Sequence, residues 1–310
     1  MLRRPVIFDT DPGVDDTIAI MLAKAHPELD IKAITPVVGN VPYKYTSENA
    51  IRLAEYLGID CKIGIGAENP LFIKAEDAGD VHGKGGLGGY ELPATDRKPD
   101  GYAWDIFRDE AIKAAGELEL ITLGPLTNIA ITFMRYPEIK PLIKRIWCMG
   151  GSTYDGNITA KAEFNIWVDP DACSYVFKSG VPVTMCGLDG TEYAYLTIDE
   201  LRSLQGRETK IKEVFDHILG FMIGRREKAP EDDKLQTIYD AVTVAYVLDQ
   251  SIGRTTKYHV SVETKGPNAG WTIVDKRNKQ KKPLNVDVLE WADREKFKAV
   301  LEEMLEFYRI

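Results

Sequence analysis

Four aspartates lie within eight residues close to the N-terminus, in the stretch VIFDTDPGVDDTIAIML. They are Asp9, Asp11, Asp15 and Asp16, and apolar runs precede and follow them. Two unit charges about 4 Å apart repel each other by about 1 kcal/mol in water and by several times that near a protein surface. Because carboxylate oxygens are preferred ligands of hard cations, the cluster predicts a site for Ca²⁺ or Mg²⁺.

The spacing of the cluster indicates how the chain would present it. Asp9 and Asp11 are two residues apart and point the same way on an extended chain. After a Pro-Gly turn, Asp15 and Asp16 fall in the first turn of a helix, where carboxylates suit the free N–H groups. The competing interpretation, an N-cap among incidental turn residues, explains only one or two of the four. An EF-hand loop does not match, because Gly13 stands at its fifth position.

Short runs rich in β-branched residues recur along the chain, each followed by turn residues and a helical pattern. This alternation predicts an α/β fold with a single open, mostly parallel sheet and helices on both faces. The first helix should end at His26, before Pro27, and a second, within residues 46–58, at Gly58. The expected strands lie within residues 5–8, 31–39, 61–66, 118–125, 145–151 and 181–189.

The last part of the chain has a different pattern. Residues 258–264, 270–275 and 285–289 resemble short strands around a basic turn, and a final helix should run from about Trp291 to Tyr308. We find no internal repeat or low-complexity linker and expect one domain, residues 1–310. Residues 72–101, rich in glycine and charge, have the length of a lid, and residues 227–235 form a second expected loop.

Composition restricts the class of partner. The 310 residues carry a net charge of −9, which argues against nucleic acid or an anionic membrane as the main partner. The first apolar run is too short for a signal-peptide core, and no stretch has the length of a membrane span. The four cysteines form no CxxC pair and are expected to be free thiols, which together with the missing signal predicts a cytoplasmic protein.

A series of motifs resembles the inosine-uridine-preferring nucleoside hydrolase family. DTDPGVDD is similar to the family signature, and further motifs follow in the family's order. They are VVGN ending at Asn40, LGPLTNIA from Leu123, MGGSTYDGN from Met149, AEFNIWVDPDAC from Ala162, GLDGT from Gly187 and YDAVTVAYVLD from Tyr239. The resemblance covers essentially the whole chain and implies the Rossmann-like fold of that family.

The resemblance implies an enzyme that hydrolyses the N-glycosidic bond of ribonucleosides to ribose and free base, with a bound Ca²⁺. It implies inverting attack by a water that the ion holds and Asp11 activates, and a homo-oligomer, either dimer or tetramer. The implied metal ligands are Asp11, Asp16, the main-chain carbonyl of Leu123 and Asp240. The implied ribose contacts are Asp15, Asn40, Asn157, Glu163 and Asn165, with Met149 nearby. Asp9 would support and orient the other aspartates.

Elementary chemistry makes these roles reasonable. Departure of the base leaves an oxocarbenium-like ribosyl cation, which nearby carboxylates would stabilise. A divalent ion can hold water and ribose hydroxyls in one geometry and lower the pKa of the water. A general base such as Asp11 typically contributes about 10²–10⁴-fold in rate.

Several of these residues have a structural interpretation as well. Asp240 could be the N-cap of the apolar helix after it, and Asn40 and Asn157 each adjoin a glycine, so turn chemistry alone could place them. Glu163 and Asn165 flank Phe164 in an apolar run and need polar partners, which ribose hydroxyls would supply.

For two further residues, a structural role and a role at the site are again the alternatives. Asp169, just before Pro170, is expected to be a helix cap. His82, in the glycine-rich loop, is either a solvated loop residue or a substrate contact.

The chain departs from the family pattern at the residue before the last metal ligand. The best-studied branch has a histidine there that is thought to protonate the departing base, whereas this chain has Tyr239. A tyrosine with its usual pKa near 10 is a poor donor at neutral pH. Tyr239, His82, another lid residue or water could act as the acid, and Tyr239 could also stack on the base.

Two other functions are compatible with parts of the sequence. A Ca²⁺-dependent nucleoside or ribose binder with little catalysis would keep the pocket and lack the acid. A phosphohydrolase of the haloacid-dehalogenase type also ends its first strand with Asp-x-Asp, but requires Thr or Val where Gly13 stands. It would account only for Asp9 and Asp11.

Overall fold

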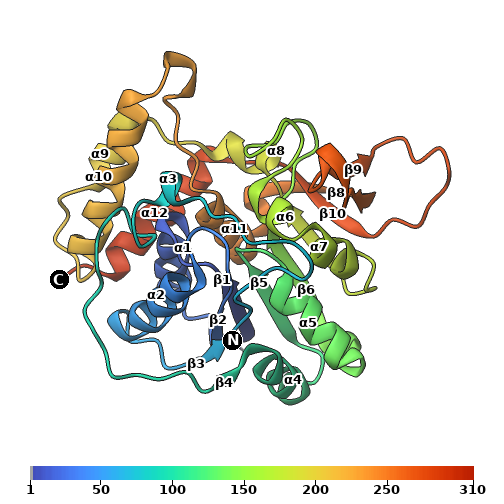
Figure 1. Cartoon of the computed structure of the whole chain (residues 1–310). Helices are drawn as coiled ribbons and strands as arrows, with labels where there is room; N and C mark the ends of the chain where they lie inside the picture. Colours follow the sequence, from blue (N-terminus) through green and yellow to red (C-terminus); the bar gives the residue numbers. More distant parts are fainter. Residues whose placement is uncertain (1–2) are drawn as a thin grey trace.

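The computed structural model describes residues 3–310 and contains one ten-stranded sheet in the order β4-β3-β2-β1-β5-β6-β7-β10-β8-β9 (Figure 1). Pairing is parallel from β4 through β10, whereas β8 and β9 are antiparallel additions at one edge. The strands are β1 (Arg4–Thr10), β2 (Leu29–Pro36), β3 (Lys62–Ile65), β4 (Gly101–Tyr102), β5 (Leu118–Thr122), β6 (Ile143–Met149), β7 (Val183–Cys186), β8 (Gly253–Val262), β9 (Thr272–Asp275) and β10 (Val286–Ala292).

The order of the strands reverses at β1. From β1 the chain builds outward through β2, β3 and β4 on one side, and from β5 it builds outward through β6 and β7 on the other. Ligands in open α/β sheets bind outside the carboxyl ends of the strands at such a switch point. Asp9 pairs in register with Thr35 of β2 and Thr122 of β5, so the end of β1 and the aspartates after it lie at this point.

Helices cover both faces of the sheet, as the alternating pattern predicts (Figure 1). One apolar layer joins the sheet to α1, α2 and α9–α12, and the other joins it to α4, α5 and α7. The α-helices are α1 (Val14–Ala25), α2 (Tyr43–Tyr56), α3 (Gly79–His82), α4 (Ala103–Ala114), α5 (Thr127–Arg135), α6 (Phe164–Val168), α7 (Pro170–Phe177), α8 (Leu188–Thr191), α9 (Ile198–Leu204), α10 (Lys212–Lys228), α11 (Tyr239–Leu248) and α12 (Arg294–Phe307). Short 3₁₀ turns span Pro137–Leu142, Glu192–Ala194, Glu231–Asp233, Gln250–Ile252 and Gly266–Asn268.

Helix α1 holds two of the four aspartates rigidly. It packs between the sheet, α11 and α12, so apolar side chains such as Ile18, Met21 and Leu22 are fully buried. Burial of each stabilises the fold by about 1.5–3 kcal/mol. The helix ends at His26 as predicted, because the following proline restricts the residue before it. The first turn of α1 is therefore a fixed platform for Asp15 and Asp16.

Some expected boundaries are wrong by a few residues. The N-cap of α1 is Gly13, so neither Asp15 nor Asp16 is the cap, and Asp16 instead accepts a hydrogen bond from the Gly13 N–H. The last helix begins at Arg294, because Asp293 caps it while the preceding residues complete β10. Helix α2 ends at Tyr56, and Gly58 follows in a left-handed conformation.

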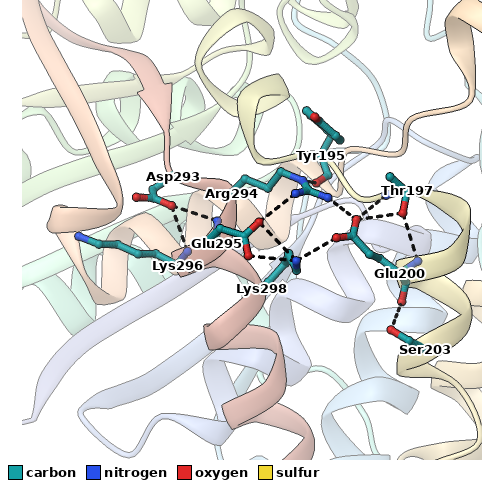
Figure 2. Close-up of polar contacts among 9 residues, drawn as sticks. All are labelled: Tyr195, Thr197, Glu200, Ser203, Asp293, Arg294, Glu295, Lys296 and Lys298. Atoms are coloured by element: carbon teal, nitrogen blue, oxygen red, sulfur yellow. Dashed lines mark hydrogen bonds and ion pairs between the residues drawn. The ribbon is translucent and has the colours of Figure 1, made fainter.

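A polar network joins the start of α9 to the start of α12 (Figure 2). Thr197 caps α9, and Glu200 receives the N–H of Thr197 in return. Glu200 also pairs with Arg294 and, at 2.9 Å, with Lys298 of α12. Because Arg294 donates to the Tyr195 carbonyl at 2.9 Å, the network also fixes the segment that connects α8 to α9.

Candidate active site

Asp11 lies at the carboxyl end of β1 and is fully buried. Its Oδ2 accepts a hydrogen bond from the Asn40 N–H at 2.7 Å, whereas its Oδ1 is buried without a partner among the described residues. A Cβ on Gly39 would lie 1.8 Å from Oδ2, and one on Gly124 would lie 2.5 Å from Oδ1. Glycine is therefore required on both sides of this carboxylate.

Three more carboxylates lie close together beside Asp11. One oxygen from each of Asp15, Asp16 and Asp240 falls within 4.8 Å of the others. Asp16 is oriented by Thr10, by the Gly13 N–H at 2.9 Å and by the Asn40 side-chain amide at 2.9 Å. Asp240 is the second residue of α11, whose N-cap is Ile238, so its interpretation as an N-cap is wrong.

Burial raises the pKa of every carboxyl in the cluster. Those of Asp15 and Asp16 rise to about 6, and those of Asp11 and Asp240 rise well above the usual value. Burial is the main cause, and repulsion among the neighbouring aspartates adds to it for Asp11, Asp16 and Asp240. Buried carboxylates at these distances, with an orphaned oxygen on Asp11, fit a hard divalent cation.

Leu123 directly follows β5, which ends at Thr122, and it lines the same cavity as Asp15 and Asp240. Its carbonyl accepts a hydrogen bond from the Asn165 side-chain amide at 2.7 Å, and the same amide reaches the carbonyl of Met149 at 3.2 Å. Asn165 thus bridges the ends of two parallel strands and orients an oxygen that could serve as a fifth ligand.

Glu163 and Asn157 also have partners within the chain. Glu163 caps the short helix α6, accepting from the N–H groups of Asn165 at 2.9 Å and Ile166 at 3.2 Å, and from Gly151 at 2.7 Å. Burial raises its pKa to about 7. The Asn157 side chain accepts from the Phe164 N–H at 2.9 Å. The backbone thus holds both side chains in place, and both line the cavity of about 410 Å³ described below.

Asp9 lies near the end of β1, and its side chain binds none of the other aspartates. Its Oδ1 accepts from the Thr35 hydroxyl at 2.6 Å and from the Asn128 side chain at 2.8 Å, and burial raises its pKa to about 7. Asp9 is held by Thr35 and Asn128, neither of which lines the cavity, whereas Asp11 is bound to Asn40 of the cavity wall, so Asp9 is not placed as a nucleophile. The haloacid-dehalogenase interpretation of the Asp-x-Asp pair is therefore wrong.

His82 is the last residue of α3, inside the glycine-rich segment, and only 7% of its surface is exposed. The interpretation as a solvated loop residue is therefore wrong. Its Nδ1 accepts from the Val14 N–H at 3.3 Å, and burial lowers its pKa to about 4. The ring is consequently neutral at pH 7 and faces the cavity.

Ten of the twelve predicted site residues line one cavity of about 410 Å³. They are Asp15, Asn40, His82, Leu123, Met149, Asn157, Glu163, Asn165, Tyr239 and Asp240, and the other two, Asp11 and Asp16, are bound to Asn40. Tyr239 donates to Glu192 at 3.3 Å, and burial raises its pKa further above the usual value.

Part of the cavity wall was not predicted from the sequence. It comes from the end of α10 and the segment up to α11, and it consists of Met222, Arg225, Arg226, Asp233, Gln236 and Thr237, with Phe164 and Glu192 nearby. The arginine pair at the end of an apolar helix, just before the loop at residues 227–235, was the available signal.

Asp169 and the cysteines behave as expected. Asp169 caps α7 by accepting from the Ala172 N–H at 3.0 Å, and it also binds Thr127 at 2.7 Å. All four cysteines are free thiols.

The sequence matches the family described as inosine-uridine preferring nucleoside hydrolase over residues 6–299. The chain belongs to this family. It is 38% identical over 289 residues to the non-specific ribonucleoside hydrolase RihC of Escherichia coli O127:H6 (strain E2348/69 / EPEC), covering 93% of each chain. The resemblance inferred from the motifs is confirmed, and so is its implication of an enzyme that cleaves the N-glycosidic bond of ribonucleosides.

Solved structures of nucleoside hydrolases share the fold. The plant nucleoside hydrolase PpNRh1 superposes with a TM-score of 0.91 at 31% identity, covering 97% of this chain and 98% of that one. The purine-preferring ribonucleoside hydrolase from Gardnerella vaginalis superposes with a TM-score of 0.90 at 32% identity, covering 98% and 99%. The predicted α/β class with one open, mixed sheet is confirmed. Among residues 3–310, none of the helices combines the length and apolar character of a membrane span.

Proposed function

We propose that this nucleoside hydrolase cleaves its substrate in the cavity at the carboxyl ends of β1, β5 and β6, with a bound Ca²⁺ and Asp11 as general base. The observation that carries the proposal is the orphaned Oδ1 of Asp11 beside three further carboxylates, of which Asp16 and Asp240 are buried and Asp15 is partly exposed. The cavity of about 410 Å³ lies within the range of about 300–1,000 Å³ that is typical of small-molecule sites.

The proposed ion ligands are Asp11, Asp16, Asp240 and the carbonyl of Leu123, and the geometry also brings Asp15 within reach. When bound, Ca²⁺ would lower the pKa of a water and fix the positions of ribose hydroxyls. These donors are all oxygens, which is the chemistry that Ca²⁺ prefers.

Other steps of the reaction would depend on the side chains of the site: activation of the water, stabilisation of the ribosyl cation, and binding of the ribose and the base. Asp11 takes a proton from the attacking water, and the buried carboxylates stabilise the positive charge that develops on the ribose. Direct attack by water without a covalent intermediate, which the family resemblance implies, predicts inversion at C1′. The side chains proposed to hold the ribose are Asp15, Asn40, Met149, Asn157, Glu163 and Asn165, and those proposed to flank the base are Tyr239 and His82.

The test is product analysis with a panel of purine and pyrimidine ribonucleosides. The proposal predicts equal amounts of ribose and free base from at least one nucleoside, and no release by the Asp11→Asn variant on the same time scale. A nucleoside that raises the melting temperature without being consumed would instead indicate the binding protein that lacks catalysis.

We also propose that residues 1–310 act as one domain and that the chain forms a homo-oligomer in the cytoplasm. The single sheet supports the first proposal, and the family resemblance supports the second. A solution mass of one chain would contradict the oligomer.

A further inference from the structure

The wall formed by the end of α10 contributes two neighbouring arginines to the cavity, and their surroundings differ. Arg226 binds side chains through two of its three guanidinium nitrogens: its Nε donates to the Gln236 side chain at 2.9 Å, and its Nη1 binds the Asp233 carboxylate at 2.6 Å. Arg225 is about half buried, yet it makes no hydrogen bond or ion pair with any side chain that the structure describes. The two residues are therefore not equivalent.

The guanidinium nitrogens of Arg225 are not among the buried unpaired atoms, so water in the cavity can reach them, and a polar ligand could take the place of that water. The carboxylates that act on Arg225, Asp233 and Asp15, are too far away to pair with it. Asp233 is already bound to Arg226. This arrangement leaves the donors of Arg225 available to a molecule in the cavity.

The reaction creates a negative charge in the same cavity. As the C1′–N bond breaks, its electron pair stays with the base, while the water oxygen bonds to C1′ and a water proton passes to Asp11. Among the described lining residues, the Tyr239 hydroxyl already donates to Glu192 at 3.3 Å, and the Nδ1 of His82 already accepts the Val14 N–H at 3.3 Å. Of the two arginines of the wall, Arg225 is the one that binds no side chain among those that the structure describes.

We propose that Arg225 stabilises the departing base as an anion, by donating hydrogen bonds to its ring nitrogen or carbonyl oxygen while charge accumulates there. A guanidinium stays protonated and cannot act as the acid, so the base leaves with negative charge and takes up a proton from solvent afterwards. This role rests on the proposed function, and it accounts for an enzyme whose sequence has Tyr239 where a branch of the family has a histidine.

The test compares Arg225→Met and Arg225→Lys on inosine and on p-nitrophenyl riboside. Loss of one preorganised donor typically costs about 10²–10³-fold in kcat. We expect a loss of that size for inosine with Arg225→Met, a change in KM of less than about threefold, and a loss within about tenfold for Arg225→Lys. Nitrophenolate is already a stable anion, so its riboside should lose less than about fivefold.

Arg202→Met is the matched control. Arg202 of α9 pairs with Glu227 on the same end of α10, outside the cavity, so its loss should leave the kinetics unchanged.

Each other outcome has a defined meaning. Equal losses on both substrates, or an effect confined to KM, would overturn the role of Arg225 in an enzyme that otherwise works. Faster cleavage of inosine 5′-monophosphate than of inosine, abolished by Arg225→Met, would show that the arginine binds a phosphate instead. Wild-type protein that releases ribose from no nucleoside would overturn the proposed function and this inference together.

Discussion

Replacing Asp11 by asparagine should reduce catalysis and stabilise the metal-free protein at the same time. The variant keeps the size of the side chain, and its amide oxygen can still accept the Asn40 N–H that Oδ2 accepts now at 2.7 Å. The fold should therefore persist, because Gly39 and Gly124 leave space for an amide as they do for the carboxylate. What the variant loses is a base and a buried negative charge.

The magnitudes follow from the surroundings of Asp11. Loss of a general base should lower kcat by about 10²–10⁴-fold, measured with Ca²⁺ at saturation. Two charges about 5 Å apart at an effective dielectric constant of about 20 repel by about 3 kcal/mol. Because burial and the neighbouring Asp16 already raise the pKa of Asp11, its charge is partly suppressed, and we expect a gain of about 1–2 kcal/mol in the free energy of unfolding of chelated protein.

The assay pairs ribose release with thermal unfolding in the presence of a chelator. Asp169→Asn is the matched control, because Asp169 is an equally buried carboxylate that caps α7 outside the cavity. This control should lower the melting temperature while the activity per folded molecule is unchanged. Near-wild-type activity of Asp11→Asn, or a lower melting temperature of its chelated form, would refute the reasoning.

The remaining predictions concern the stabilising ion pairs of Glu200, the role of Tyr239 in the departure of the nucleobase, and the close contact between Gly39 and Asp11. Burial opposes ionisation of Glu200, but hydrogen bonds from Lys298, Thr197 and Arg294 outweigh it and lower the pKa of this carboxyl to about 2 (Figure 2). Because the pKa is lower in the folded protein than its usual value of 4.5, ionised Glu200 stabilises the fold at pH values above 4.5. This contribution is lost as the pH falls towards 2. Glu200→Gln should therefore cost about 1–2 kcal/mol at pH 7 after allowance for partial exposure, and a denaturant titration that finds the same deficit at pH 3 would contradict this. Tyr239→Phe should slow inosine and p-nitrophenyl riboside equally, by less than about tenfold, and a much larger loss on inosine would make Tyr239 the proton donor. Gly39→Ala should abolish ribose release, because its Cβ would lie 1.8 Å from Asp11 Oδ2, and a variant with wild-type kcat would show that the loop yields at no cost.

Much of the fold could be predicted because the apolar pattern and the turn residues agree along the chain. The strand ending at Asp9 and the helix ending at His26 follow from local signals alone. The order of the strands does not, since the neighbours β1 and β5 are separated by over a hundred residues and their pairing depends on packing. Boundaries such as the start of α12 depend on which of several polar residues becomes the cap.

The residues of the candidate site also include some that local sequence predicts and some that only the fold brings together. Asp11, Asp15 and Asp16 lie within six residues of one another, so the density of acidic side chains alone indicates a site. Asp240 and Leu123 were assigned only through the family resemblance. Arg225 was missed because an arginine near the end of a helix is normally a surface residue. Its partial burial, and its lack of a partner among the side chains that the structure describes, arise from how α10 lies over the cavity, which no local pattern encodes.

The most direct test of the central claim is stepwise reconstitution of chelated protein with Ca²⁺ while ribose release from a cleavable nucleoside is measured. We expect no activity after chelation and a linear return of activity that reaches its maximum at about one ion per chain. Full ribose release by protein in which elemental analysis finds no metal would contradict it.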